Sequence, residues 1–298
     1  MPPKLLPALV AGALALCAGL VQAETMNTLE RIRKSGSIAL GHRESSIPFS
    51  YVDDRNQVVG YSHDIALKIL DAVRSELQLP ELKVRLVSFP PLTRLPMVQN
   101  GMIDLECGST SLNGERARQV AFSAPIFVIN TRLMTRADSG IRDFADLAGK
   151  NVVTTAGTTS ERLLRKLNVE RQLDMRLISA RDHGESFLQL ESGRVAAFVM
   201  DDMLLYGERA KARKPQDWAV VGTPLSQEAY ACTLRKDDPA FKALVDRTIG
   251  GLMQSGEINE IYRKWFMQPI PPKSLNLNFP ASDANRALFR AADATPAH

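Results

Sequence analysis

Apolar strands alternate with an amphipathic helix in the first part of the chain. Ile65, Ile69 and Val73 recur at helical spacing and fall on one face, whereas residues 82–87 largely alternate between apolar and polar positions. Strands that alternate with helices favour a parallel sheet in an α/β protein. The pattern predicts strands at 37–40, 82–87 and 103–107 and helices at 62–79 and 94–99.

The same alternation starts again near residue 151, after a long extended segment at 127–135. A second α/β unit is therefore expected, with its own parallel strands and covering helices. Its predicted strands are at 151–154, 175–179, 195–200 and 218–221, and its helices at 160–167, 185–191 and 202–211.

Two extended segments, 127–135 and 229–235, fit inside neither unit. If both cross between the units, they form a two-strand hinge that permits closure around a ligand. The helical run 239–266, broken at Ser255-Gly256, would then return to the first lobe. We therefore expect lobe 1 at 24–128 and 229–268, lobe 2 at 129–228, and an irregular C-terminal surface tail at 269–298.

Residues 1–23 have the pattern of a cleaved signal peptide. Lys4 precedes an apolar run, and Val21-Gln22-Ala23 ends in small residues suited to signal peptidase. Pro7 and the short apolar run argue against a membrane anchor, and Cys17 leaves a lipoprotein as an alternative. The mature protein is expected to be soluble and exported.

Charge and cysteine content narrow the function further. The formal net charge is +4 and is spread along the chain, so nucleic-acid binding, which needs clustered cations, is not expected. Cys107 and Cys232 remain after processing, and in an oxidising compartment a disulfide between them is favoured over two buried thiols.

Enzyme signatures are missing from the sequence. It contains no Gly-x-Ser-x-Gly, P-loop or Gly-x-Gly-x-x-Gly motif, and its histidines show no metal-ligand spacing. We therefore expect no catalytic residue, no metal and no cofactor, although paired acids from distant positions leave catalysis open.

Polar side chains instead follow several predicted strands, at the edge where open α/β sheets bind ligands. An acidic amino acid needs cations for two carboxylates, an anion for its ammonium, and several hydrogen-bond donors. Each candidate also has an ordinary structural role: Thr158 and Asp201 suit helix N-caps, and a lone arginine is usually a solvated charge. The candidates are Arg43, Ser109, Ser111, Arg116, Thr158, Thr159, His183 and Asp201.

Longer motifs carry a family resemblance. Gly-His-Arg-Glu-Ser-Ser-x-Pro-Phe-Ser-Tyr at 41–51, Glu-Cys-Gly-Ser-Thr at 106–110 and Ser-Gln-Glu-Ala-Tyr at 226–230 resemble the periplasmic glutamate/aspartate-binding proteins of ABC importers, within solute-binding protein family 3. The resemblance spans nearly the whole mature chain. It implies the two-lobed type II binding-protein fold, a monomer, and capture of L-glutamate or L-aspartate for inner-membrane permease subunits.

The resemblance also implies roles for individual residues. Asp201 would bind the ligand's ammonium, and Arg94 enters the site on this ground alone. One departure is Pro91, where the family has a serine that can donate to the side-chain carboxylate. The implied α-carboxylate partners are Arg116, Ser109 and Ser111; Arg43, Arg94 and His183 would surround the side-chain carboxylate, and Thr158 and Thr159 would close from the second lobe.

Two other functions stay open at this point. Similar two-lobed folds include dehydratases acting on prephenate or arogenate, for which Glu44 beside Arg43 is the nearest candidate acid. A sensory protein that presents its ligand to a separate receptor is the other alternative.

Overall fold

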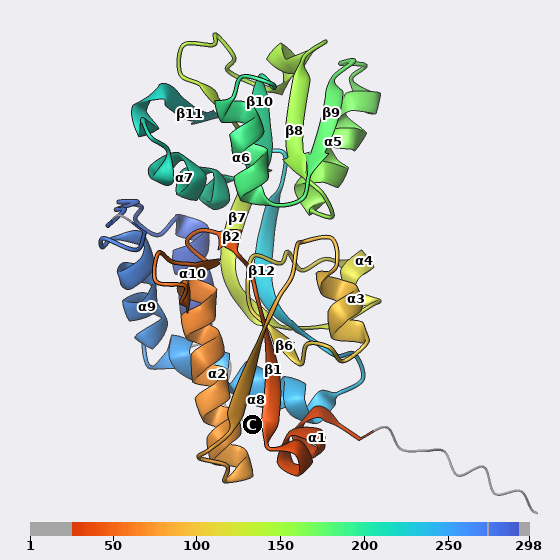
Figure 1. The fold of residues 1–298 in the computed structure, drawn as a ribbon, viewed down its shortest axis with the longest axis vertical. Helices are drawn as coiled ribbons and strands as arrows, with labels where there is room; N and C mark the ends of the chain where they lie inside the picture. The colour runs from red at the N-terminus through yellow and green to blue at the C-terminus, as the bar shows by residue number, and fades with distance from the viewer. Residues whose placement is uncertain (1–25, 273, 292–298) are drawn as a thin grey trace, which may run out of the picture.

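Two α/β lobes are stacked one above the other and joined by crossing strands (Figure 1). The structure is a computed structural model and describes residues 26–272 and 274–291. Strands β7 (Ala121–Arg136) and β12 (Gln227–Leu234) pair antiparallel and run from the lower lobe toward the upper one. The predicted signal peptide at 1–23 lies outside the described residues.

The lower lobe contains a sheet in the order β5-β1-β6-β12-β7. Strand β1 (Ser37–His42) pairs in parallel with β5 (Lys83–Ser88) and with β6 (Leu105–Glu106). A separate antiparallel sheet contains β2 (Ser45–Ser46), β3 (Ser50–Val52) and β4 (Val58–Val59). The helices of this lobe are α1 (Thr28–Ser35), α2 (Tyr61–Leu77), α3 (Arg94–Gln99), α4 (Gly114–Ala117), α8 (Pro239–Gln254), α9 (Glu257–Phe266) and α10 (Asp283–Ala291).

The upper lobe continues the same path of strands as β7-β10-β8-β9. Strand β10 (Ala197–Asp201) lies antiparallel to β7 and parallel to β8 (Asn151–Thr155), whose other neighbour is β9 (Arg176–Ala180). The remaining elements are β11 (Trp218–Val221), α5 (Thr159–Glu170), α6 (His183–Glu191), α7 (Asp202–Lys211) and the short 3-10 helices Phe144–Leu147 and Pro215–Asp217.

Many elements expected from the hydrophobic pattern are confirmed. The helix predicted at 202–211 and the strand predicted at 218–221 match residue for residue. The break expected at Ser255-Gly256 separates α8 from α9, and Gly256 has the left-handed φ of 77°. Since glycine adopts this conformation without a Cβ penalty, the chain turns sharply there.

The predicted irregular tail is wrong at 283–291, which forms α10. Phe289 is buried and lies edge-on to Tyr262, with ring centroids 5.8 Å apart. Asn285 accepts a hydrogen bond from the Val128 amide and donates one to its carbonyl, at 2.8 and 3.0 Å. These partners lie far away in sequence, so the local pattern carried no sign of them. Helix α1 and the β2–β4 sheet were likewise not predicted.

The predicted disulfide is confirmed. Cys107 and Cys232 are joined with a Cα–Cα distance of 4.3 Å, tying the end of β6 to β12. Beside it, Phe49 makes edge-to-face contacts with Phe127 and Tyr230, at centroid distances of 4.9 and 5.0 Å. Aromatic packing and the disulfide both stabilise the folded protein at this part of the crossing strands.

None of the helices within 26–272 and 274–291 has the length and apolarity needed to cross a membrane.

Candidate functional site

All nine residues predicted as ligand contacts line a single small cavity between the two lobes. Pro91 and Met200 complete its lining. The nine are Arg43, Arg94, Ser109, Ser111, Arg116, Thr158, Thr159, His183 and Asp201.

The lower wall is built where strands end. Arg43 directly follows β1, and Ser109 and Ser111 follow β6. Arg116 lies on the short helix α4, whose N-cap, Asn113, accepts a hydrogen bond from the Arg116 amide at 2.9 Å. Arg94 begins α3 and does not follow a strand. A search for polar residues at strand ends could therefore not identify it.

The upper wall is built from helix N-termini and a strand end. Thr158 caps α5, accepting from the Glu161 amide at 3.1 Å and donating to the Thr155 carbonyl at 2.7 Å. The capping role proposed for Thr158 is thus confirmed, and the residue lines the cavity as well. His183 begins α6, and Asp201 ends β10.

Three guanidinium groups dominate the electrostatics of the cavity. Arg43 and Arg94 are each 3% exposed, and Arg116 is 7% exposed. Burial lowers the pKa of Arg43 and of Arg94 to about 10 and that of Arg116 to about 9, so all three stay charged at neutral pH. The charge of Arg94 further lowers the pKa of Arg116. Buried like charges that repel one another favour an anion between them.

Two of these arginines also connect the lobes. Arg94 donates to the Pro91 carbonyl at 2.6 Å, and Arg116 donates to the Ser111 carbonyl at 2.9 Å. Both guanidiniums reach the Gly157 carbonyl of the upper lobe, at 3.5 Å for Arg94 and 3.2 Å for Arg116. The cationic wall is therefore held against the opposite wall by main-chain acceptors.

A buried carboxylate that the sequence pattern did not reveal, Glu106, lies beneath the arginines. It is fully buried on β6 and accepts hydrogen bonds from Thr233 at 2.8 Å and Thr110 at 3.2 Å. Burial raises its pKa, and the charges of Arg94 and Arg43 oppose that rise. Two charged residues, Asp104 and Glu106, interrupt the predicted strand 103–107, and they were the available signal, because such residues are rarely buried without a partner.

Asp201 provides the negative group of the upper wall. It is 2% exposed and accepts hydrogen bonds from Ser160, at 2.7 Å, and from the Tyr230 hydroxyl. Burial, with a smaller contribution from Glu228, raises the pKa of Asp201 to about 7. Because its hydrogen-bond partners are hydroxyls rather than cations, a bound ammonium would stabilise the ionised form.

His183 is a neutral donor or acceptor in this wall. It is 1% exposed, and burial together with Arg43 and Arg94 holds its pKa well below the usual 6.5. Its Nδ1 lies 2.9 Å from the Thr155 hydroxyl. Nε2 is buried and has no partner among the described residues, so it is available to a ligand in the cavity.

Across 26–272 and 274–291, no group of three or more His, Cys, Asp or Glu side chains is arranged so that it could hold a metal ion.

Two α/β lobes joined by crossing strands, with a small charged cavity between them, define a two-lobed solute-binding protein. The family model for bacterial extracellular solute-binding proteins, family 3, matches residues 38–268, and the chain belongs to this family. The chain is 56% identical to the L-glutamate/L-aspartate-binding protein of Pseudomonas aeruginosa over 96% of its own length and 95% of that protein's. It is 55% identical to the glutamate/aspartate import solute-binding protein of Escherichia coli K12, over 95% and 96% of the two chains.

Solved structures agree on the fold. The P235GK mutant of ArgBP from T. maritima superposes with a TM-score of 0.71 at 24% identity, covering 80% of this chain and 98% of its own. An ancestral arginine-binding protein bound to arginine superposes with a TM-score of 0.70 at 26% identity, covering 78% and 98%.

Proposed function

We propose that this protein captures L-glutamate and L-aspartate outside the cytoplasm and delivers them to the permease of an ABC importer. The observation that carries the proposal is the presence of three buried guanidiniums and one buried carboxylate, Asp201, in the lining of the same cavity. An acidic amino acid has the complementary charges, two carboxylates and one ammonium. The names of the relatives from P. aeruginosa and E. coli support the same ligand class.

The ligand's α-carboxylate is assigned to Arg116, with Ser109 and Ser111. The planar guanidinium makes two parallel hydrogen bonds to a carboxylate, which fixes its orientation as well as its charge. The ammonium is assigned to Asp201, whose raised pKa of about 7 falls again when a cation binds beside it.

The side-chain carboxylate is assigned to Arg43, Arg94 and His183. Burial leaves Nε of both arginines without a partner among the described residues, so each has a donor to offer. Pro91 has no side-chain donor, and its carbonyl instead accepts from Arg94. The Pro91 position thus orients a ligand-binding arginine rather than contacting the carboxylate itself.

We propose that the two lobes close about the crossing strands β7 and β12. In this proposal the lower lobe corresponds to the predicted lobe 1 at 24–128 and 229–268, and the upper lobe to the predicted lobe 2 at 129–228. Contacts between lobes surround the cavity: Ser111 Oγ lies 3.3 Å from Thr159 Oγ1, and Arg162 pairs with Glu115 at 2.6 Å. Ligand charges would join the two walls in the same way. We propose that the protein acts as a monomer in the periplasm after removal of residues 1–23.

Catalysis is not part of the proposal. Glu44, the candidate acid for a dehydratase, does not line the cavity of the nine residues and accepts a hydrogen bond from Ser88 at 2.6 Å. A receptor partner remains compatible with ligand capture, since presentation to a receptor would use the same bound state.

Calorimetric titration of protein that has been unfolded, freed of carried-over ligand and refolded tests the proposal. L-Glutamate and L-aspartate are expected to bind with dissociation constants of about 1 μM, which corresponds to roughly −8 kcal/mol. Glutamine should bind far more weakly, and prephenate should neither bind tightly nor be converted. If neither acidic amino acid bound, or if prephenate were converted, the proposal would be overturned.

A further inference from the structure

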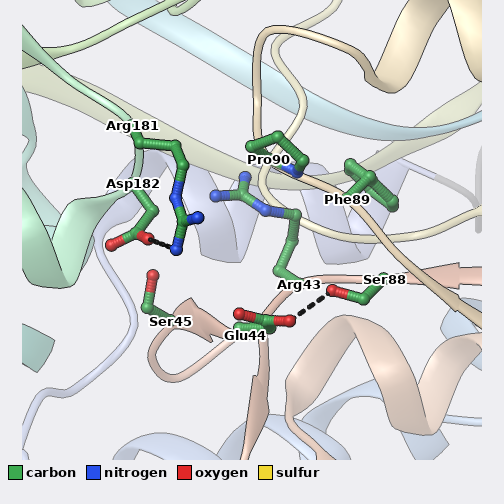
Figure 2. Close-up of a pocket in the computed structure, with 8 residues that line it drawn as sticks. All are labelled: Arg43, Glu44, Ser45, Ser88, Phe89, Pro90, Arg181 and Asp182. Atoms are coloured by element: carbon green, nitrogen blue, oxygen red, sulfur yellow. Dashed lines mark hydrogen bonds and ion pairs between the residues drawn. The ribbon is translucent and has the colours of Figure 1, made fainter.

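A second pocket adjoins the ligand cavity at the end assigned to the side-chain carboxylate. It has a volume of about 100 Å³ and lies between the lobes (Figure 2). Arg43 lines both the pocket and the ligand cavity. Pro90 and Asp182 line the pocket, and the residues that follow them in sequence, Pro91 and His183, line the ligand cavity. The Arg43 side chain therefore stands between the two spaces.

The pocket contains buried polar atoms that nothing in the described part of the chain satisfies. Nε of Arg43 and Oγ of Ser45 are both buried without a hydrogen-bond partner there. Arg43 is 3% exposed, so bulk water does not satisfy its unused donor. Unsatisfied buried polar atoms are costly, and they mark a place where a ligand or an ordered water supplies the partner.

Its charges are balanced, unlike those of the ligand cavity. The cations are Arg43 and Arg181, and the anions are Glu44 and Asp182. Figure 2 shows the Arg181 guanidinium projecting from the upper lobe toward the centre of the pocket. Arg181 pairs with Asp182 at the long distance of 3.6 Å, and its side chain is 75% exposed, so this loose pair exchanges partners at little cost.

The remaining lining suits a short neutral linker. The Phe89 ring lies 5.7 Å from the Arg43 guanidinium carbon, and Pro90 adds a second apolar surface. Next to them, Ser45 and the two carboxylates are acceptors for an amide N–H, while Arg43 is a donor for an amide carbonyl. An amide flanked by these groups would be fully hydrogen-bonded.

We propose that this pocket is an extension subsite, which admits acidic amino acids whose side-chain carboxyl is joined by an amide to a second carboxylate-bearing unit, as in a γ-glutamyl dipeptide. The inference rests on the proposed function, because the glutamyl part occupies the cavity described above. The amide passes beside Arg43, and the terminal carboxylate pairs with Arg181. The negative charge that the side chain loses on amide formation is thus restored one residue further on.

The test is competition against bound radiolabelled L-glutamate in the full mature protein. γ-L-Glutamylglycine is expected to compete. Its isomer α-L-glutamylglycine is the matched control and should not compete, because its glycine is attached to the carboxyl that Arg116 requires. If the two isomers compete equally, or if neither does while glutamate binds, the extension subsite does not exist. Failure of glutamate itself to bind would instead overturn the proposed function.

A variant separates the two ligands. Arg181→Ala should weaken γ-L-glutamylglycine by up to about fivefold, the value of an exposed ion pair, and leave glutamate affinity unchanged. The control is Arg176→Ala, an exposed arginine at the opposite end of β9, which should affect neither ligand. Equal loss of both ligands in Arg181→Ala would show that Arg181 serves closure or glutamate binding, and would overturn the subsite.

Discussion

The two walls of the ligand cavity use opposite electrostatic strategies. The lower wall presents Arg43, Arg94 and Arg116, which remain charged at neutral pH because their lowered pKa values still lie at about 9 to 10. The upper wall presents hydroxyls, a neutral His183 and Asp201, whose pKa is raised to about 7. The lower wall therefore attracts carboxylates at any physiological pH, whereas the upper wall becomes fully anionic only when a cation arrives.

A comparison of the two buried carboxylates leads to the same conclusion. Glu106 is balanced by Arg94 and Arg43 as well as by two threonine hydroxyls, so it is an internal counter-charge. Asp201 also interacts electrostatically with Arg94 and Arg116 and accepts hydrogen bonds from the hydroxyls of Ser160 and Tyr230, but unlike Glu106 it lines the cavity. This difference is consistent with a framework role for Glu106 and with the ligand contact proposed for Asp201.

Arg116→Ala should have the largest effect, because it removes a cation from the lower wall and leaves the Ser111 and Gly157 carbonyls without this donor. Breaking a buried ion pair costs about 3–5 kcal/mol, so calorimetry should detect no glutamate binding at micromolar concentrations. Arg118→Ala, an exposed change on the same segment, is the control and should bind normally. Micromolar binding by Arg116→Ala in a folded protein would remove the arginine from its assigned role.

Asp201→Asn tests the upper wall. Removing one partner of a buried charge pair should weaken glutamate by about 2–5 kcal/mol, but should weaken glutarate, which has no ammonium, far less. Titration of the variant with both ligands measures the two losses. Equal losses would contradict the assignment of Asp201 to the ammonium.

The pH dependence of glutamate binding separates the contribution of Asp201 in the upper wall from that of the arginines in the lower wall. Because Asp201 has a pKa of about 7 in the free protein and must be ionised to hold an ammonium, binding below pH 7 releases a proton. Glutamate affinity should therefore fall by up to about tenfold per pH unit below 7. Calorimetry in buffers of different ionisation enthalpy measures this release. The release should disappear in Asp201→Asn, and its persistence there would assign the titration to another group.

Gly157→Ala tests whether the two walls of the cavity must come into contact for glutamate to bind. A Cβ there would lie 2.6 Å from the Leu92 Cα of the opposite lobe, and Gly157 has a φ of +76°. Overpacking of this kind costs about 1–3 kcal/mol, which the protein avoids by opening, so glutamate affinity measured by titration should fall. Gly140→Ala is a matched control, since Gly140 has the same φ of +76° but no atom of the described residues lies within 4 Å of where its Cβ would be. Equal affinities in the two variants would show that contact at Gly157 is not needed for closure.

Local pattern was sufficient for much of the fold and for one kind of site residue. Helix α7 and strand β11 were predicted to the residue, because strong periodicity and end signals coincide there. Arg43 and Ser109, which follow strands, and Asp201, which ends one, were predicted as ligand contacts from these positions, and all three line the cavity. Arg94 became known only through the family resemblance, since it starts a helix.

What the sequence pattern missed depends on distant partners. Helix α10 is held by Asn285 on the Val128 main chain, a contact that spans more than half of the sequence, and by Phe289 on Tyr262. Glu106 was overlooked as a counter-charge because its partners, Thr233 and the two arginines, come from other elements. Such contacts follow from the folded arrangement and have no local signature.

The smallest effect is expected at the rim of the walls. Arg162 of the upper lobe pairs with Glu115 of the lower lobe at 2.6 Å, but both side chains are more than half exposed, at 55% and 53%. Exposed ion pairs contribute about 0.2–1 kcal/mol and are screened by salt. Arg162→Ala should therefore weaken glutamate no more than about fivefold at low ionic strength, and less at about 0.5 M salt, which titration at the two concentrations would measure. The neighbouring Lys166→Ala, whose ion-pair partner Glu170 lies on the same helix, should leave affinity unchanged. A salt-independent loss in Arg162→Ala as large as that of Gly157→Ala would mean that the rim, and not the cavity, holds the two walls together.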